Sequence, residues 1–190
     1  NEGLLTDEEP SLEESDLEDR IVSSRIQRAI EEVTENTENY EFNLAIGELD
    51  KLLTKLYWYQ QRDADPAIFS HGVETLVQLI APYAPHTAEE LWEDLGHEEF
   101  MLESSWPEVD DQLLDQQAER VDEYFDRVSS DIRDIEEMID GEPEKVKIIQ
   151  AADWKYQAFS SIIDNLELRD VGEIMDEVLD GELKRHAQDI

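Results

Sequence analysis

Three basic residues and a tryptophan form the clearest candidate for a binding site in this sequence. Lys51, Lys55, Trp58 and Arg62, the basic strip, follow one another at steps of four, three and four residues. On an α-helix this spacing places them on one face, about 100° from the apolar face of the same segment. Because cations attract phosphate and an indole ring stacks on bases, the strip predicts a nucleic-acid contact. The alternative is that Trp58 belongs to the core and that the cations pair with neighbouring acids.

A second basic cluster lies nearer the C-terminal end and holds three of the six lysines. Lys145 and Lys147 belong to a short β-branched run, and Lys155 follows it. These lysines are a further candidate for RNA binding. An equally good interpretation is a solvated edge strand, which lysines protect from pairing with other chains.

The sequence shows no motif for catalysis or metal binding. His71, His86, His97 and His186 are scattered, and His71 one helical turn from Glu74 is more typical of a surface pair than of a metal site. Cysteine is absent, which excludes disulfides and thiolate zinc sites and fits a reducing compartment. Phosphate-binding glycine loops and the nucleophile elbow of hydrolases are missing too. We therefore expect neither a catalytic residue nor a metal site.

Apolar residues at helical spacing predict a mainly α-helical protein. Three stripes indicate the first three helices: Val22, Ile26, Ala29 and Val33; Ala45, Leu49, Leu52, Leu56 and Tyr59; Ile68, Gly72, Leu76 and Leu79. The longest stripe predicts a long amphipathic helix ended by Gly141 and Pro143, and it contains Leu114, Ala118, Val121, Phe125, Val128, Ile132, Ile135 and Ile139. This helix and four shorter ones would make an antiparallel bundle.

A corner rich in proline, "APYAPHTAEELWEDLG" at residues 81–96, joins the third and fourth helices. Pro82 ends one helix, and either Pro85 or a Thr87–Glu90 capping box begins the next. Gly96 is the predicted left-handed C-cap. The predicted buried face of the fourth helix consists of Leu91, Trp92 and Leu95. The corner therefore has an architectural role.

The chain divides into three predicted regions: an acidic, frayed lead-in (1–15), the bundle (16–142) and the start of a small α/β extension (143–190). In the extension, Lys145 to Ala151 predicts a strand, followed by a helix and by two more short helices at 171–179 and 181–190. One strand cannot form a sheet alone, so its partners must lie beyond residue 190 or in another chain. We therefore expect a truncated extension. Since the chain begins without Met, we also expect it to be an internal piece of a longer protein.

Acidic residues dominate the composition, with 51 Asp and Glu against 15 Lys and Arg and a net charge of −36. One interpretation is an ordinary acidic protein that repels nucleic acid and attracts basic partners. The other is a protein from a salt-rich cytoplasm, where the Debye length falls to ~3 Å at 1 M salt and carboxylates keep the surface hydrated. The acids are dispersed over nearly every helix rather than clustered, which favours the second interpretation.

The corner sequence, followed by "SSWP", resembles the anticodon-binding helical domain of leucyl-tRNA synthetases. The Pro85–His86 pair, Gly96 and Trp106–Pro107 look leucine-type, and "DRIVSSRIQRAIEEV" and "YEFNLAIGELDKLL" are similar to the first two helices of that family. Further along, "SDIRDIEEMI" and "VKIIQAADWKYQAF" resemble the archaeal and eukaryotic branch. Together with the acidic surface, this resemblance points to a haloarchaeal enzyme.

The resemblance implies a tRNA-binding and tRNA-positioning part of a ligase that attaches leucine to leucine tRNA. The parent would use ATP and Mg²⁺, whereas none of the catalytic or cofactor residues falls within this sequence. The implied partners are leucine tRNA and the catalytic and editing domains of the same chain. We expect a cytoplasmic monomer that does not bind DNA. No apolar run approaches the ~20 residues that span a bilayer, so we expect no membrane partner either.

Two alternatives stay open at the level of sequence. The first is the same domain of a valyl- or isoleucyl-tRNA synthetase, which shares the helix corner. The second is a stand-alone acidic helical adaptor that binds a basic protein. The unpaired strand and the missing Met argue against the adaptor.

Overall fold

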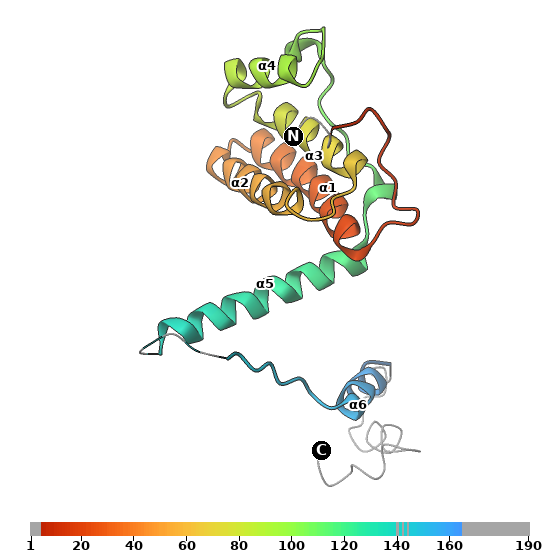
Figure 1. Cartoon of the computed structure of the whole chain (residues 1–190), viewed down its shortest axis with the longest axis vertical. Coiled ribbons are helices and arrows are strands. Elements are labelled where there is room, and N and C mark those ends of the chain that lie inside the picture. Colours follow the sequence, from red (N-terminus) through yellow and green to blue (C-terminus); the bar gives the residue numbers. More distant parts are fainter. Residues whose placement is uncertain (1–4, 140, 142, 144, 165–190) are drawn as a thin grey trace. The chain divides into compact units, whose positions relative to one another are not determined.

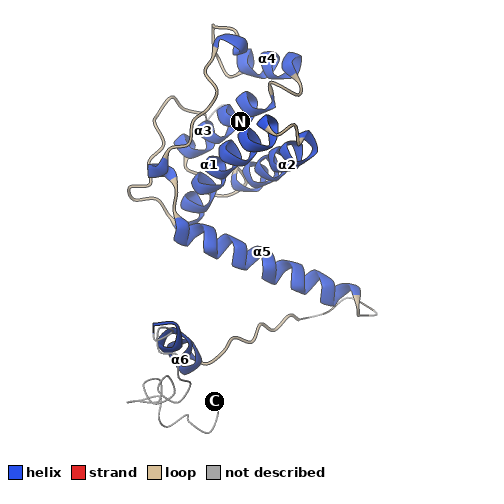
Figure 2. Cartoon of the chain, turned by 180° about the vertical axis from the view of Figure 1, so that it is seen from behind, coloured by secondary structure: helices blue, strands red, loops and turns tan. Residues whose placement is uncertain are grey.

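The computed structural model describes residues 5–139, 141, 143 and 145–164, and the helices predicted at 171–179 and 181–190 lie outside these residues. The described part is mainly helical, as predicted, and contains no strand (Figure 2). The chain divides into two compact units, Asn1–Asp134 and Ile135–Ile190, which are described separately. In chain order the elements are α1 (Leu17–Glu38), α2 (Phe42–Tyr59), α3 (Pro66–Ile80), α4 (Pro85–Asp94), η1 (Met101–Glu103), η2 (Asp111–Leu113), α5 (Gln116–Glu137) and α6 (Asp153–Asp164).

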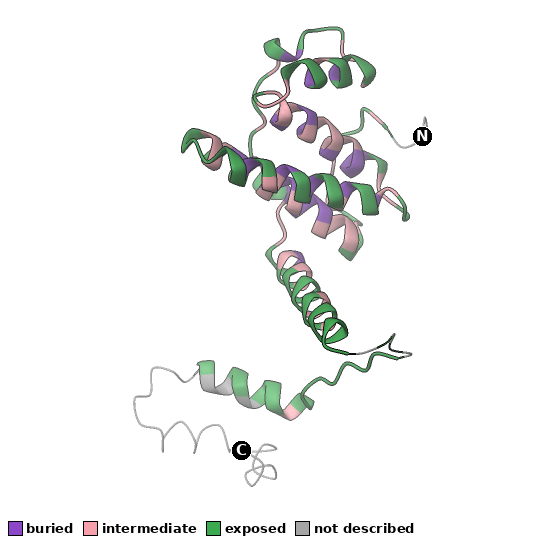
Figure 3. Cartoon of the chain, turned by 90° about the vertical axis from the view of Figure 1, so that its left-hand side faces the viewer, coloured by how far each residue is buried: buried purple, intermediate pink, exposed green. Residues whose placement is uncertain are grey.

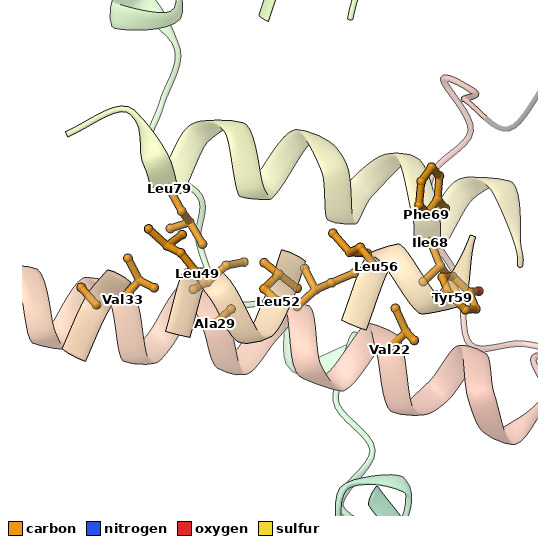
Figure 4. Close-up of a cluster of buried hydrophobic side chains, with 13 residues drawn as sticks. Val22, Ala29, Val33, Leu49, Leu52, Leu56, Tyr59, Ile68, Phe69 and Leu79 are labelled. Carbon is orange, nitrogen blue, oxygen red and sulfur yellow. The ribbon is translucent and has the colours of Figure 1, made fainter. Parts of the chain in front are cut away.

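Helices α1, α2 and α3 pack side by side and enclose the main core (Figure 1). The three predicted stripes form this core, and Leu52 and Ile68 are completely buried (Figure 4). Gly72 lies where α3 comes closest to its neighbours: an added Cβ would stand 2.6 Å from Leu56 Cδ2 and 2.9 Å from Ile26 Cδ1. Glycine at this position therefore permits the close approach of the three helices.

Polar groups fix the ends of the core helices. Asp16 caps α1 in a reciprocal capping box with Asp19, and Asp65 caps α3 just before Pro66. The Tyr59 hydroxyl, at the end of α2, donates to Asp19 Oδ1 at 2.5 Å and accepts from the Asp65 backbone N–H at 2.9 Å. Burial, reinforced by the hydrogen bond to Asp19, raises the pKa of Tyr59. This hydroxyl therefore ties the starts of α1 and α3 to the end of α2.

The proline corner forms as predicted, with one wrong detail. Helix α4 begins at Pro85, no side chain caps it, and Gly96 has a φ of 98°. Trp92 is only 5% exposed and packs in a second cluster with Val77 and Met101. Leu91, predicted to be buried, is 41% exposed. Among the described elements, helix α4 packs mainly against α3 and η1, so its buried face is narrow, and Leu91 points about 100° away from Trp92 around the helix.

Helix α5 forms at the predicted place, although Leu114 and Ile139 at the two ends of the stripe lie outside it, and its apolar face is not covered as predicted. Figure 3 shows most of this helix as exposed. Among its residues only Ala118 is buried, and Phe125 and Ile135 are 59% and 56% exposed. The expectation that this helix completes the apolar bundle is therefore wrong for the described residues. The first turns of α5 instead contact the core helices through charged groups: Glu119 pairs with Arg28, and Asp122 pairs with Lys55.

The second unit contains α6, which confirms the helix predicted after the β-branched run. The run itself, Lys145 to Ala151, is not a strand. A strand needs a hydrogen-bonded neighbour, and the described residues supply none. None of the described helices has the length and apolar composition to span a bilayer.

Residues 105–115, here called the connector, contact polar residues of α1 and lead into α5. Trp106 Nε1 donates to Thr34 Oγ1 at 2.8 Å. The buried Ser23 hydroxyl donates to the Leu113 carbonyl at 2.9 Å. These contacts anchor both ends of the connector on α1. In the lead-in, expected to be frayed, the Thr6 N–H donates to Ser70 Oγ at 2.8 Å, and Leu12 packs against the core.

Candidate nucleic-acid interface

Lys51, Lys55 and Trp58 of the basic strip lie on the outer side of α2, and Arg62 follows three residues after the helix ends at Tyr59. Trp58 is 56% exposed, so the interpretation of Trp58 as a core residue is wrong. The side chains of Lys51 and Arg62 are 64% and 62% exposed, and that of Lys55 is 29% exposed. The neighbouring stripe of α2 is buried against α1 and α3, which fixes the direction in which the strip points. Lys51 and Trp58 therefore face outward on α2, and Lys55 is partly covered. Arg62, predicted on the same helix, instead lies in the turn after α2 ends at Tyr59.

Helix α2 is also the least acidic of the three longest helices. Its 18 residues include two acids, Glu48 and Asp50, whereas the 22 residues of α5 include eight. Repulsion of a polyanion falls with the local density of carboxylates, so α2 is the part of this surface that a phosphate backbone approaches most easily.

Each cation of the strip pairs with a carboxylate. Lys51 Nζ lies 2.7 Å from Glu48 Oε1, and Lys55 Nζ lies 2.5 Å from Asp122 Oδ1. Arg62 pairs with Glu18 on α1. This part of the alternative interpretation is correct. The side chains of Arg62 and Glu18 are 62% and 37% exposed, and exposed pairs of this kind contribute only ~0–1 kcal/mol and are weakened by salt, so a phosphate group can replace the Glu18 carboxylate. The pairs of Lys51 and Lys55 include partly buried side chains.

Glu48 is the most strongly perturbed acid beside the strip. Its partial burial favours the protonated form, but hydrogen bonds with Glu32, Lys51 and Arg25 outweigh burial and lower the pKa of Glu48 to about 2. Burial, followed by the hydrogen bond with Glu48, raises the pKa of Glu32. Glu48 therefore keeps its negative charge while it holds Arg25 at 2.6 Å.

An open groove runs beside the strip between α1, α2 and α5. Trp58 and Phe125 contribute aromatic surface to it. Its lining contains six basic residues: Arg25, Arg28, Lys51, Lys55, Arg62 and Arg133. Eight acids also line it: Asp16, Glu18, Glu32, Asp50, Glu119, Asp122, Glu123 and Asp126. In a chain with 51 acids and 15 basic residues, this groove is unusually balanced in charge.

Sequence reasoning missed the contribution of α1 to this groove. Arg25 and Arg28 lie one turn apart on α1, and both line the groove opposite the strip. Their spacing on the polar face of the first predicted helix was an available signal. No signal in the sequence indicated their proximity to Lys51 and Lys55, because that proximity depends on how α1 and α2 pack.

The second basic cluster belongs to the second unit. Lys145 and Lys147 are exposed. Lys155 Nζ lies 5.4 Å from the centroid of the Trp154 ring, within reach of a cation–π interaction. Lys155 thus stands beside an aromatic ring, although the predicted strand that would align Lys145 and Lys147 is not formed.

Two histidines form a polar cluster that the sequence did not predict. Glu74 pairs with His97 at 3.2 Å, not with His71. His71 is half-buried, and its Nε2 lies 3.2 Å from Gln27 Nε2. The interpretation of His71 and Glu74 as a surface pair is therefore wrong for His71. Within the described part of the chain, no group of three or more His, Asp or Glu residues could hold a metal ion.

Comparison with known proteins agrees with this arrangement. The family described as the anticodon-binding domain of tRNA ligase matches residues 19–151, which include the core helices, the corner, the connector and α5. The chain belongs to this family. The match covers the basic strip and the lining of the groove except Asp16, Leu17 and Glu18, so the strip lies within an anticodon-binding-type domain.

Several relatives of the chain are leucine–tRNA ligases. That of Methanocaldococcus jannaschii is 30% identical over 174 residues, which are 90% of this chain and 18% of the relative. That of Halobacterium salinarum is 31% identical over 170 residues, 88% of this chain and 18% of the relative. The chain therefore spans less than a fifth of the length of these curated relatives. A similar solved structure, the ternary complex of Agrobacterium radiobacter K84 agnB2 LeuRS with tRNA and LeuAMS, has a TM-score of 0.53 and 31% identity, and the match covers 56% of this chain and 14% of that one.

Proposed function

We propose that this chain is the tRNA-binding and tRNA-positioning part of a leucine–tRNA ligase. The observation that carries the proposal is the 30–33% identity to leucine–tRNA ligases across 90% of the chain. The leucine-type features of the sequence have structural roles that support it, because Pro85 begins α4 and Trp106 is hydrogen-bonded to α1. In the whole ligase, leucine would be activated with ATP and Mg²⁺ by other domains and transferred to leucine tRNA.

The basic strip is the surface that we assign to the tRNA. Trp58 offers an exposed ring for stacking, and Lys51, Lys55 and Arg62 exchange their carboxylate partners for phosphates. The rest of the bundle holds this contact rigidly on a packed core, so that the tRNA end is directed toward the distant reaction centre. Lys145, Lys147 and Lys155 are secondary candidates for the same ligand.

We further propose a haloarchaeal, cytoplasmic and monomeric parent. The support is the dispersed net charge of −36. Self-repulsion of 51 acids should destabilise the fold at low ionic strength and be screened at high ionic strength. We expect a melting temperature clearly higher in about 2 M KCl than in about 0.1 M KCl, where the Debye length is still ~10 Å. Equal melting temperatures would contradict the adaptation to salt.

The experiment for tRNA positioning uses the full-length ligase that contains this chain. In molar KCl, the double variant Trp58→Ala/Arg62→Ala should raise the KM for leucine tRNA about tenfold or more, because one stacked base contributes roughly 1–3 kcal/mol. Leucine-dependent ATP–pyrophosphate exchange needs no tRNA and should keep its wild-type rate.

The matched control is Tyr124→Ala/Arg127→Ala, which removes an exposed aromatic ring and an exposed cation from α5, outside the lining of the groove. This variant should aminoacylate normally. Normal aminoacylation by the strip variant would remove the strip from the tRNA contact. A full-length protein that charges valine or isoleucine tRNA instead would overturn the leucine assignment.

A further inference from the structure

A short chain of hydrogen bonds links His71 on α3 to the connector. The Asp110 backbone N–H donates to Gln27 Oε1 at 2.8 Å, and Gln27 Nε2 lies 3.2 Å from His71 Nε2. Gln27 itself is 1% exposed, so water does not easily replace either contact. One buried amide on α1 thus faces the connector at one end and an imidazole at the other.

The protonation state of His71 follows from the chemistry of these groups. A backbone N–H can only donate, so the Gln27 oxygen must face Asp110 and its NH₂ group must face His71. The NH₂ group can only donate as well, so His71 Nε2 must accept. His71 is therefore the neutral tautomer that carries its proton on Nδ1. Burial lowers the pKa of His71 from its ordinary value of 6.5, in agreement with this assignment.

Protonation removes the acceptor. In the imidazolium form both ring nitrogens donate, and His71 Nε2 then points a proton at the Gln27 NH₂ group. Turning the amide over would satisfy His71, but it would set the NH₂ group against the Asp110 N–H. One of the two hydrogen bonds is lost in either orientation. We propose that His71 is a pH-sensitive pin for the connector, holding it on α1 when neutral and releasing it when protonated.

Nearby charged groups raise the pKa of His71, but less than burial lowers it. Glu74 from α3, Glu9 from the lead-in and Asp110 from the connector all favour the imidazolium. Glu74 Oε1 also lies 3.2 Å from His97 Nε2. From α1 the neighbour is the neutral amide of Gln27. An open cleft lined by the lead-in, α3 and the loop after α4 reaches His71, so protons have access from solvent.

Release of the connector would act on the start of α5. The connector ends at Asp115, whose backbone N–H donates to Ser24 Oγ at 2.7 Å and whose carboxylate accepts from the Ala118 N–H. Since α5 has one buried residue, these polar contacts carry much of its attachment. The pin therefore acts five residues before Asp115, next to the contacts with Ser24 and Arg20 that hold the start of α5.

The test is amide hydrogen exchange of the full chain, measured by NMR in molar KCl, with each rate divided by the intrinsic rate at the same pH. Protection of the Asp110 amide should be constant above the ordinary histidine pKa of 6.5. Below it, protection should fall by up to about tenfold per pH unit until the lower native pKa is reached, because the released form binds the extra proton. Unchanged protection between about pH 7.5 and pH 5 would overturn the proposal.

Two variants make the test independent of overall stability. His71→Gln supplies a carbonyl acceptor that does not titrate, so the Asp110 amide should stay protected at low pH. Gln27→Glu supplies a carboxylate that accepts from both Asp110 and the imidazolium, so protection should increase as pH falls. His86→Asn on the exposed face of α4 and His97→Asn are the controls, and both should keep the wild-type direction of change. If Gln27→Glu loses protection at low pH as the wild type does, or His71→Gln titrates like the wild type, the pin does not exist.

Discussion

Helices α2 and α5 belong mainly to the same unit and carry apolar stripes of equal regularity. The two stripes differ in burial. The α2 stripe is buried against α1 and α3, with Leu52 fully enclosed and Leu56 3% exposed. The α5 stripe is mostly open, with Phe125 59% exposed. The periodicity of a sequence therefore indicates which face of a helix is apolar, whereas the cover of that face depends on contacts that the periodicity does not contain.

The two helices also differ in what holds them. Apolar burial fixes α2, and its polar side is left available for a ligand. Charged and capping groups fix the start of α5: Asp115 pairs with Arg20, Glu119 with Arg28, and Asp122 with Lys55. We infer that salt and pH change the attachment of α5 more readily than that of α2.

The largest expected effect comes from truncating the α2 stripe. Leu52→Ala should lower the free energy of unfolding by about 2–5 kcal/mol, because it removes fully buried methyl groups and leaves a cavity among three helices. Chemical denaturation in molar KCl measures this. A loss below about 1 kcal/mol would mean that α1–α3 is not the main core.

A smaller effect is expected where α5 begins. Asp115 accepts hydrogen bonds from the Gln117 and Ala118 N–H groups, so Asp115→Ala should cost about 0.5–2 kcal/mol of stability near neutral pH. The hydrogen bond from Ala118, together with that from Gln117 and the pair with Arg20, lowers the pKa of Asp115 below its ordinary 3.8. A lowered carboxylate pKa contributes stability above pH 3.8, and this contribution disappears as the pH falls through the native pKa.

The wild type and Asp115→Ala should therefore converge in stability as the pH falls below 3.8 and through the lower native pKa of Asp115. Denaturation at several pH values checks this, with Asp111→Ala as a control from the same segment. A difference that is constant with pH would show that the variant acts through something other than the carboxylate.

The smallest effect is expected from the open part of α5. Phe125→Ala should change the free energy of unfolding of the chain by less than about 0.5 kcal/mol, because its ring is already largely in water. Compared with Leu52→Ala in the same denaturation assay, this variant tests the contrast between the two helices directly. A loss of several kcal/mol would show that the α5 stripe is covered in solution.

Much of the bundle could be predicted from local sequence signals. The stripes of α1–α3, the start of α4 at Pro85 and the left-handed Gly96 follow from helical spacing and from the backbone preferences of proline and glycine. The exposure of Leu91 and the absence of a strand at Lys145–Ala151 could not be predicted in this way. Both depend on which partner lies next to the segment, and that information is spread over distant parts of the chain.

For the candidate site, the sequence predicted the exposed face of α2 but not the residues that surround it. The spacing of the basic strip indicated an outward face, and the structure places Trp58 there. The carboxylate partners of Lys55 and Arg62 lie 67 and 44 residues away along the chain, so spacing on one helix could not reveal them. The contact between Gln27 and His71 spans 44 residues and was missed for the same reason.

The contact between the basic strip and leucine tRNA can be tested most directly by photo-crosslinking in the full-length ligase. The residue p-benzoylphenylalanine would replace Trp58 on α2 in one variant and the equally exposed Tyr124 on α5 in another, with exposed fractions of 56% and 57%. Both variants are irradiated with leucine tRNA in molar KCl. We expect a specific crosslink from position 58 that excess unlabelled leucine tRNA removes, and little crosslinking from position 124. No crosslink at position 58, or equal crosslinks at both positions, would contradict the assignment of α2 as the tRNA-contacting helix.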